Sequence, residues 1–135
     1  MQDLKNRGVH IPETLFISVG NKRTLVDLHK ETGWNKTVLK PAVSGAARHT
    51  YLLDAANIED HERIFAELIE REDMLLQPLQ EKVVTEGEVS HMVFGGKYSH
   101  SVLKIAKPGD FRVQDDFGGS VHDNQADQEE IDFAE

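Results

Sequence analysis

The chain has no cysteine among its 135 residues, which excludes both a disulfide framework and a thiolate metal site. No apolar run approaches the roughly 18 residues that a membrane span needs, and the first residues lack the apolar core of a signal peptide. We therefore expect a cytoplasmic protein with no membrane partner. Nothing in the composition indicates an oligomeric state.

Basic residues are scarce at the C-terminal end. The net charge is −9, and residues 110–135 hold nine Asp and Glu with Arg112 as their single base. This balance argues against nucleic acid as a partner. We expect the acidic tail, residues 122–135, to be solvated and poorly ordered; an interaction tail and a helix lacking its partners are the alternatives.

The predicted elements indicate an α+β fold with antiparallel sheet, and the length suits one domain with a real core. Helices are expected over 2–7, 22–32 and 58–71, with Asn21 and Asn57 capping the last two. Gly95-Gly96 predicts a tight hairpin turn. Strands are expected over 14–18, 37–43, 50–53, 74–77, 88–94, 97–105 and 111–114.

Two common nucleotide motifs are absent, because the chain has neither GxxxxGK[ST] nor GxGxxG. A different arrangement is present around Lys40, which lies in an apolar strand directly before the small-residue loop Ser44–Thr50. A lysine there is costly unless its ammonium meets an anion, and small residues let backbone amides approach phosphate oxygens closely. The alternative is an edge-strand lysine that reaches solvent beside an ordinary hairpin turn.

A second group of residues follows the apolar run Met74–Leu76. The strand continues through Gln77 into Pro78, where backbone groups can face a flat heterocycle. Glu88 comes about ten residues later and can accept hydrogen bonds from ribose hydroxyls.

Taken in order, a series of short motifs over residues 4–121 resembles the ATP-grasp superfamily, closest to the glutathione synthetase branch and its cyclo-ligase relatives. The motifs are Gly8-Val9, Pro12-Glu13-Thr14, Val38-Leu39-Lys40-Pro41, Ser44-Gly45, Leu76-Gln77-Pro78, Glu86-Gly87-Glu88, Ser99-His100-Ser101-Val102-Leu103-Lys104, Asp110-Phe111-Arg112-Val113-Gln114 and Gly118-Gly119. Each motif alone is weak, and their order and spacing make the resemblance specific.

The resemblance implies a ligase that uses ATP and Mg²⁺ to convert a small carboxylate into an acylphosphate, which an amine or thiol then attacks. It implies one subdomain over 1–73 with the phosphate lysine and flap, and a second beginning over 74–121. Cofactor-binding roles fall on Lys40, on the flap residues Ser44, Gly45 and Ala46, on the adenine hinge Gln77, Pro78 and Leu79, and on Glu88. Lys104 and Arg112 match basic residues of the substrate and phosphate pocket. Gln77 and Lys104 also fit a purely structural place in an apolar strand.

Two departures from the family pattern concern the phosphates. The family's other phosphate lysine falls at or before Met1, and its metal ligands come well after the counterpart of Gly118-Gly119. Glu129, Glu130 and Asp132 lie in a polar stretch without a strand pattern, so we assign no metal ligand. We expect the chain to be catalytically incomplete. The alternatives are a non-catalytic nucleotide- or partner-binding module of this fold and an unrelated interaction domain that uses the acidic tail.

Two histidines offer a competing site. With Gly95-Gly96 as the turn, His91 is expected directly opposite His100 on one face of the hairpin. Zinc binding would need a third ligand, and the sequence indicates none. Two histidines on a half-exposed sheet are the simpler interpretation, and a substrate-pocket role for His100 is the next.

Overall fold

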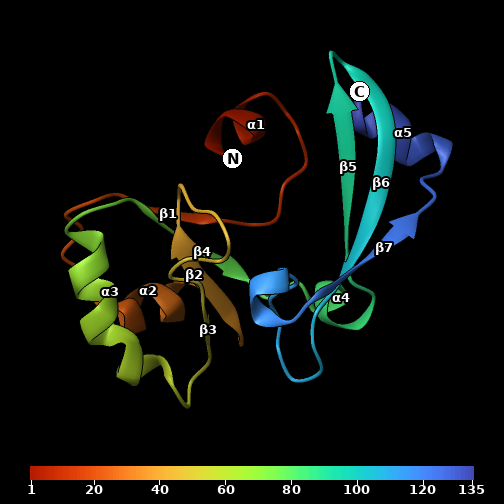
Figure 1. The fold of residues 1–135 in the computed structure, drawn as a ribbon. Helices are drawn as coiled ribbons and strands as arrows, with labels where there is room; N and C mark the ends of the chain where they lie inside the picture. Colours follow the sequence, from red (N-terminus) through yellow and green to blue (C-terminus); the bar gives the residue numbers. More distant parts are fainter. The chain divides into compact units, whose positions relative to one another are not determined.

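The computed structural model describes all residues, 1–135, and consists of two compact units, Met1–Leu79 and Gln80–Glu135 (Figure 1). The expected α+β class with antiparallel sheets is confirmed. The boundary between the units follows Leu79, later in the chain than the expected division between residues 73 and 74. The reason is that the strand Met74–Pro78 is hydrogen bonded inside the first sheet. No helix combines the length and the apolar character that crossing a membrane requires.

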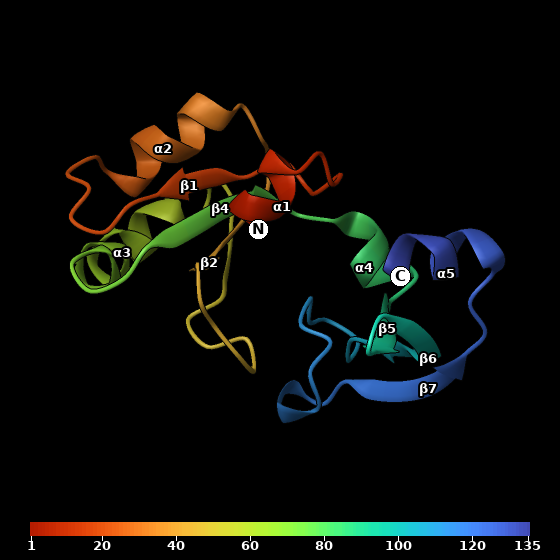
Figure 2. The ribbon, with the colours of Figure 1, turned by 90° about the horizontal axis from the view of Figure 1, so that it is seen from above.

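The first unit is built on a four-stranded sheet in the order β1-β4-β2-β3 (Figure 2). Its strands are β1 Leu15–Ile17, β2 Thr37–Pro41, β3 Tyr51–Leu53 and β4 Met74–Pro78. Its helices are α1 Gln2–Asn6, α2 Leu25–Thr32, the short 3₁₀ helix η1 Ile58–His61 and α3 Glu62–Ile69. Along β2 buried and half-buried residues alternate, so its buried residues share one face, whereas β4 buries residues on both faces.

The core lies between that face and the helices α2 and α3. Leu39 from β2 and Leu76 from β4 are directly paired and fully buried. Phe65 from α3 is 1% exposed and packs in the same cluster. Polar groups in this layer are paired, since His29 Nδ1 and Thr37 Oγ1 are hydrogen bonded at 3.0 Å. The first unit therefore provides a well-packed frame for whatever lies on the opposite face.

The helix caps differ from those expected. Thr24, not Asn21, caps α2: its Oγ1 accepts a hydrogen bond from the Asp27 amide at 3.0 Å. Asn57 makes no cap bond; it braces a turn by accepting from the Asp54 amide and donating to the Leu52 carbonyl. Both asparagines have local partners that compete with the capping role. Gly33 ends α2 as expected, with φ +69°.

The second unit is built on a three-stranded antiparallel sheet in the order β5-β6-β7. The hairpin strands β5 Glu88–Phe94 and β6 Lys97–Ile105 lie where they were expected, joined at Gly95-Gly96. The remaining elements are α4 Glu81–Thr85, the 3₁₀ helix η2 Asp115–Phe117, β7 Ser120–Asn124 and α5 Gln128–Ala134. Residues 111–114 are not a strand, contrary to expectation, because Asp110 turns the backbone there by accepting the Phe111 and Arg112 amides.

The expectation of a poorly ordered acidic tail is wrong for the backbone. Ser120–Asn124 pairs with β6, and α5 begins with a complete capping box formed by Asp127 and Glu130. Glu135 at the end of α5 accepts the Tyr98 amide at 2.9 Å and lies 3.7 Å from Lys97 Nζ. Local capping and two contacts with β6 therefore order a segment that its charge alone predicts to be loose.

Candidate functional site

Lys40 lies on the face of the first sheet opposite the core helices α2 and α3; this face is called the open face, although residues 1–3 approach it. It is half-buried, and its direct neighbour on β4 is Leu75. Leu39 and Pro41, on either side, point into the core. The strand thus presents one cation on the open face, two residues before the loop that joins β2 to β3. This loop, residues 42–50, is called the flap from here on.

Gln77 shares that open face, opposite Val38. Its side chain is 6% exposed, and its Nε2 donates to Thr14 Oγ1 at 2.7 Å and contacts the Met1 sulfur at 3.8 Å. The Leu79 amide donates to the Lys36 carbonyl at 3.0 Å. Two polar groups of the predicted adenine hinge thus hold the local structure together. For Gln77 this agrees with the structural alternative that the sequence left open; the partner Thr14 could not be read from the sequence.

The flap has an unusual backbone. Ala46, Ala47 and His49 have φ of 49°, 51° and 50°, in the left-handed region that side chains with a Cβ rarely adopt. Ser44 Oγ donates to the Arg48 carbonyl at 3.0 Å, and the Arg48 amide donates to the Gly45 carbonyl at 3.0 Å. These bonds close the flap on itself.

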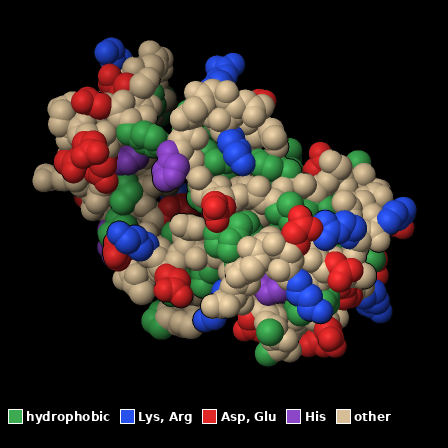
Figure 3. Space-filling view, turned by 180° about the vertical axis from the view of Figure 1, so that it is seen from behind, with side chains coloured by type: hydrophobic (Ala, Val, Ile, Leu, Met, Phe, Trp, Pro, Cys, Tyr) green, Lys and Arg blue, Asp and Glu red, His purple; other side chains and the backbone are tan.

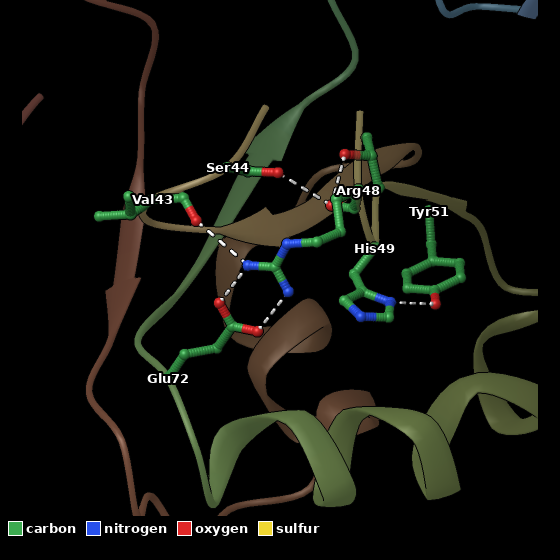
Figure 4. Close-up of polar contacts among 7 residues, drawn as sticks. Val43, Ser44, Arg48, His49, Tyr51 and Glu72 are labelled. Carbon is green, nitrogen blue, oxygen red and sulfur yellow. Dashed lines mark hydrogen bonds and ion pairs between the residues drawn. The ribbon is translucent and has the colours of Figure 1, made fainter. Parts of the chain in front are cut away.

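Arg48 ties the flap to the body of the unit (Figure 4). Its guanidinium donates to both carboxylate oxygens of Glu72, at 2.9 and 2.7 Å, and to the Val43 carbonyl at 3.3 Å. The hydrogen bonds from Arg48 lower the pKa of Glu72 and raise that of Arg48. Neither residue was singled out from the sequence. An arginine in a small-residue loop was the available signal, but its partner lies 24 residues away.

A cavity of about 470 Å³ opens on the first unit beside the start of the flap. Residues 1–3, 16–18, 42–43 and 73–75 line it. Leu75 and Phe16 are paired neighbours on the open face of the sheet. One polar group in the lining is already used, because Asp73 Oδ1 accepts the Val19 amide at 2.7 Å.

In the second unit the predicted residues pair with one another or with their sequence neighbours. Glu88 and Lys104 are directly opposite on β5 and β6, with Lys104 Nζ 3.7 Å from the Glu88 carboxylate. Arg112 donates to Asp110 through Nε and Nη2, at 3.0 and 2.7 Å. The structure thus brings Glu88 together with Lys104, and keeps Arg112 in a separate cluster.

The Arg112 cluster is held firmly. The guanidinium carbon lies 3.6 Å from the centre of the Phe117 ring, a close cation–π contact. The hydrogen bond from the Arg112 side chain, with those from the Phe111 and Arg112 amides, lowers the pKa of Asp110 to about 2 against the opposing effect of burial. The charge of Arg112 is therefore largely balanced by Asp110.

The predicted alignment of His91 with His100 is wrong. The register shifts by one residue between Met92 and Val93, so His91 faces Ser101 and Met92 faces His100. A bulge of this kind moves every later side chain to the other face. His91 Nδ1 is 3.2 Å from the Ser101 hydroxyl, which in turn is 2.6 Å from the Tyr98 hydroxyl. Ser101 is 3% exposed, and His91 and Tyr98 are half-buried, so this is a partly buried polar cluster.

The side chains do not fit a metal ion, because no group of three or more His, Asp or Glu is placed to hold one. Acidic and basic side chains are intermingled over the surface seen in Figure 3. The face it shows carries no broad area of one sign.

Comparison with known proteins identifies the fold. Neither a protein-family model nor a curated protein matches the sequence. Among solved structures, D-cycloserine synthetase DcsG matches with a TM-score of 0.75 and 25% identity, over 98% of this chain and 47% of that one. DcsG is an ATP-grasp ligase.

The chain resembles part of an ATP-grasp ligase. It spans about half the length of the enzyme it matches. The two antiparallel sheets described above are thus the counterpart of part of that enzyme. The relationship implies use of ATP and Mg²⁺ in the family.

Proposed function

We propose that this chain is the ATP-binding portion of a ligase that joins a small carboxylate to an amine or thiol through an acylphosphate. The observation that carries the proposal is Lys40 on the open face of the first sheet, directly before the flap, in a chain with the fold of part of DcsG. Phosphoryl transfer depends mainly on positioning and on neutralising charge, and a strand-borne cation beside a small-residue flap suits that task.

The residues of the first unit fit the phosphate end of ATP. Lys40 supplies a cation on the open face, and Gly45 has nothing within 4 Å of where a Cβ would stand, so an oxygen can approach its backbone. At the other end of β4, the Pro78 and Leu79 backbone forms the adenine hinge. Because the Leu79 amide already donates to Lys36, we assign the hinge contact to backbone carbonyls and to the apolar surface of the strand.

For Glu88, in the second unit, the resemblance to the family implies a ribose contact, and we assign it that role. The Lys104 ammonium lies 3.7 Å from the Glu88 carboxylate. Arg112 and Lys104 contribute positive charge to the substrate and phosphate pocket. No group of three or more His, Asp or Glu gathers in the structure, and we assign no Mg²⁺ ligand to this chain. The chain alone therefore binds nucleotide without completing the reaction.

The test is a titration of the whole chain with ATP, in which binding is monitored through changes in amide chemical shifts by nuclear magnetic resonance. One charge-assisted contact contributes roughly 1.5–3 kcal/mol, so Lys40→Ala weakens binding about tenfold or more. Lys30→Ala, an exposed lysine on α2, is the matched control and leaves binding unchanged. Equal binding by the Lys40 variant would overturn the site.

The same material gives the activity measurement. We expect a dissociation constant in the high micromolar to millimolar range, because Lys40 is the one lysine of the first unit that we assign to the phosphates and we assign no metal ligand, and each such contact is worth roughly tenfold or more. We expect no turnover of ATP with small carboxylates. Robust turnover would contradict the incomplete site, and tight binding without turnover would favour a nucleotide-binding module that is not catalytic.

A further inference from the structure

The flap holds a backbone conformation that its own residues disfavour. Ala46, Ala47 and His49 all have left-handed φ near +50°, a region that alanine rarely adopts and histidine adopts somewhat more often. Such a conformation persists only where surrounding contacts impose it. The flap is also mostly exposed, with Val43 85% exposed. Apolar burial therefore does not hold it.

The contacts that impose the conformation converge on Arg48. Its carbonyl accepts a hydrogen bond from the Ser44 hydroxyl, and its amide donates to the Gly45 carbonyl. Its guanidinium donates to the Glu72 carboxylate (Figure 4). Glu72 is fixed to the body of the unit, because its amide donates to the Leu68 carbonyl of α3 at 3.1 Å. The guanidinium is thus the point at which the flap is fastened to the packed core.

The carboxylate of Glu72 meets Arg48 as a phosphate would. A guanidinium donates two parallel hydrogen bonds equally well to carboxylate and to phosphate oxygens. The Arg48 and Glu72 side chains are 46% and 26% exposed, so a ligand in solution can reach the pair. An anion arriving at the flap therefore competes directly with Glu72.

We propose that Arg48 binds phosphate, and that the Glu72 carboxylate occupies its guanidinium when no ligand is present. In the resting state the Arg48–Glu72 pair latches the flap to the core. A phosphate group on the open face of the first sheet takes the guanidinium from Glu72, which releases the flap and lets it fold over the ligand. This inference rests on the proposed function, because the nucleotide supplies the phosphate.

The latch is tested first without ligand. Glu72→Gln keeps the size of the side chain and removes its charge. We expect the amide hydrogen exchange rates of residues 44–50 to rise about threefold to tenfold. The lost interaction is stronger than an exposed ion pair and weaker than a buried charge-assisted hydrogen bond. Glu67→Gln removes the exposed Arg63–Glu67 pair on α3 and leaves flap exchange unchanged. Unchanged exchange in Glu72→Gln would overturn the latch.

The phosphate role is tested by titration with ATP and with inorganic triphosphate, which separates phosphate recognition from adenine recognition. Glu72→Gln, freed of the competitor, binds both about threefold to tenfold more tightly than the natural chain. Arg48→Ala binds both more weakly. If Glu72 competes with phosphate, the two substitutions change ligand affinity in opposite directions. If the pair is only structural, both variants bind more weakly.

The outcomes separate this inference from the proposed function. If Lys40→Ala weakens ATP binding and Glu72→Gln does not strengthen it, the site stands and the competition is overturned. If neither ATP nor triphosphate binds the natural chain or Glu72→Gln at millimolar concentration, the phosphate role of Arg48 and the nucleotide site are both overturned, and the exchange result alone decides the latch.

Discussion

The two compact units differ most in what they bury. Thirteen hydrophobic residues are buried, and Val113 is the only one that belongs to the second unit. In that unit Phe94, Val121 and Phe133 are 68%, 57% and 71% exposed. The first unit therefore has a core in the ordinary sense, and the second has a sheet with little apolar material packed on it.

In the second unit, polar contacts connect the elements more than apolar packing does. The hairpin ladder, the Arg112–Asp110 pair, the capping box of α5 and the Tyr98–Ser101 hydrogen bond are its main connections. The charged contacts among these weaken with salt and on loss of charge, whereas apolar burial has no charge to screen. The comparison teaches that the strands around Lys40 rest on apolar burial, and that the charged surroundings of Glu88 and Arg112 should respond more to pH and salt.

The largest expected effect comes from breaking the core of the first unit. Phe65→Ala should destabilise that unit by about 3–5 kcal/mol, because it removes a ring that is 1% exposed and leaves a cavity. The single tryptophan, Trp34, lies in the first unit, so denaturant unfolding followed by its fluorescence reports that unit. Second-unit amide resonances should keep their native positions. Their simultaneous loss would show that the two units unfold as one.

A glycine comparison probes the second unit next. A Cβ on Gly119 would stand 2.2 Å from the Val113 carbonyl oxygen, and backbone cannot move aside cheaply. Gly119→Ala should destabilise the second unit by about 1–3 kcal/mol. Gly45→Ala in the flap meets nothing within 4 Å and serves as the control, with unfolding unchanged or slightly stabilised. Amide exchange in each unit measures both, and a neutral Gly119→Ala would show that the 113–119 turn is loose.

The sequence predicted best those elements whose signals are local. The turn Gly95-Gly96 and the flanking alternation place the hairpin correctly, and Gly33 marks the end of α2. The bulge at Ser99 escaped prediction because no residue type there demands it, and it is what separates His91 from His100. The order of the tail depends on contacts with β6 that charge counting does not include.

For the candidate site, residue types were more predictable than their partners. Lys40 on a strand before a small-residue flap follows from the sequence. The Arg48–Glu72 pair joins residues far apart in the chain, and the use of the Gln77 amide by Thr14 depends on where the N-terminal segment packs. Long-range polar pairing has no periodic signal, so only the structure could reveal it.

Lowering the pH should destabilise the second unit by a smaller amount than the substitutions above. Because the pKa of Asp110 is lowered from 3.8 to about 2, its contribution is complete above pH about 4 and is lost as the pH falls towards 2. After allowance for solvent screening we expect a loss of about 1 kcal/mol, confined to the second unit. Asp110→Asn should show the loss already at neutral pH. Equal acid sensitivity of that variant and the natural chain would assign the effect to another carboxylate.

The smallest expected effect compares two helix caps. Asp127 caps α5, which buries no residue, and Thr24 caps α2, which buries Leu25 and Leu28. Removing a cap typically costs about 1 kcal/mol of helix stability. In α2 the packed face couples that loss to the whole unit, so Thr24→Ala should lower the free energy of unfolding of the first unit by about this amount. In α5 nothing buried transmits it, so Asp127→Ala should raise amide exchange of residues 128–134 and change global unfolding by less than about 0.5 kcal/mol. A global loss as large as that of Thr24→Ala would mean that α5 supports the second sheet through its Glu135 contacts, and that the polar unit is more cooperative than its burial suggests.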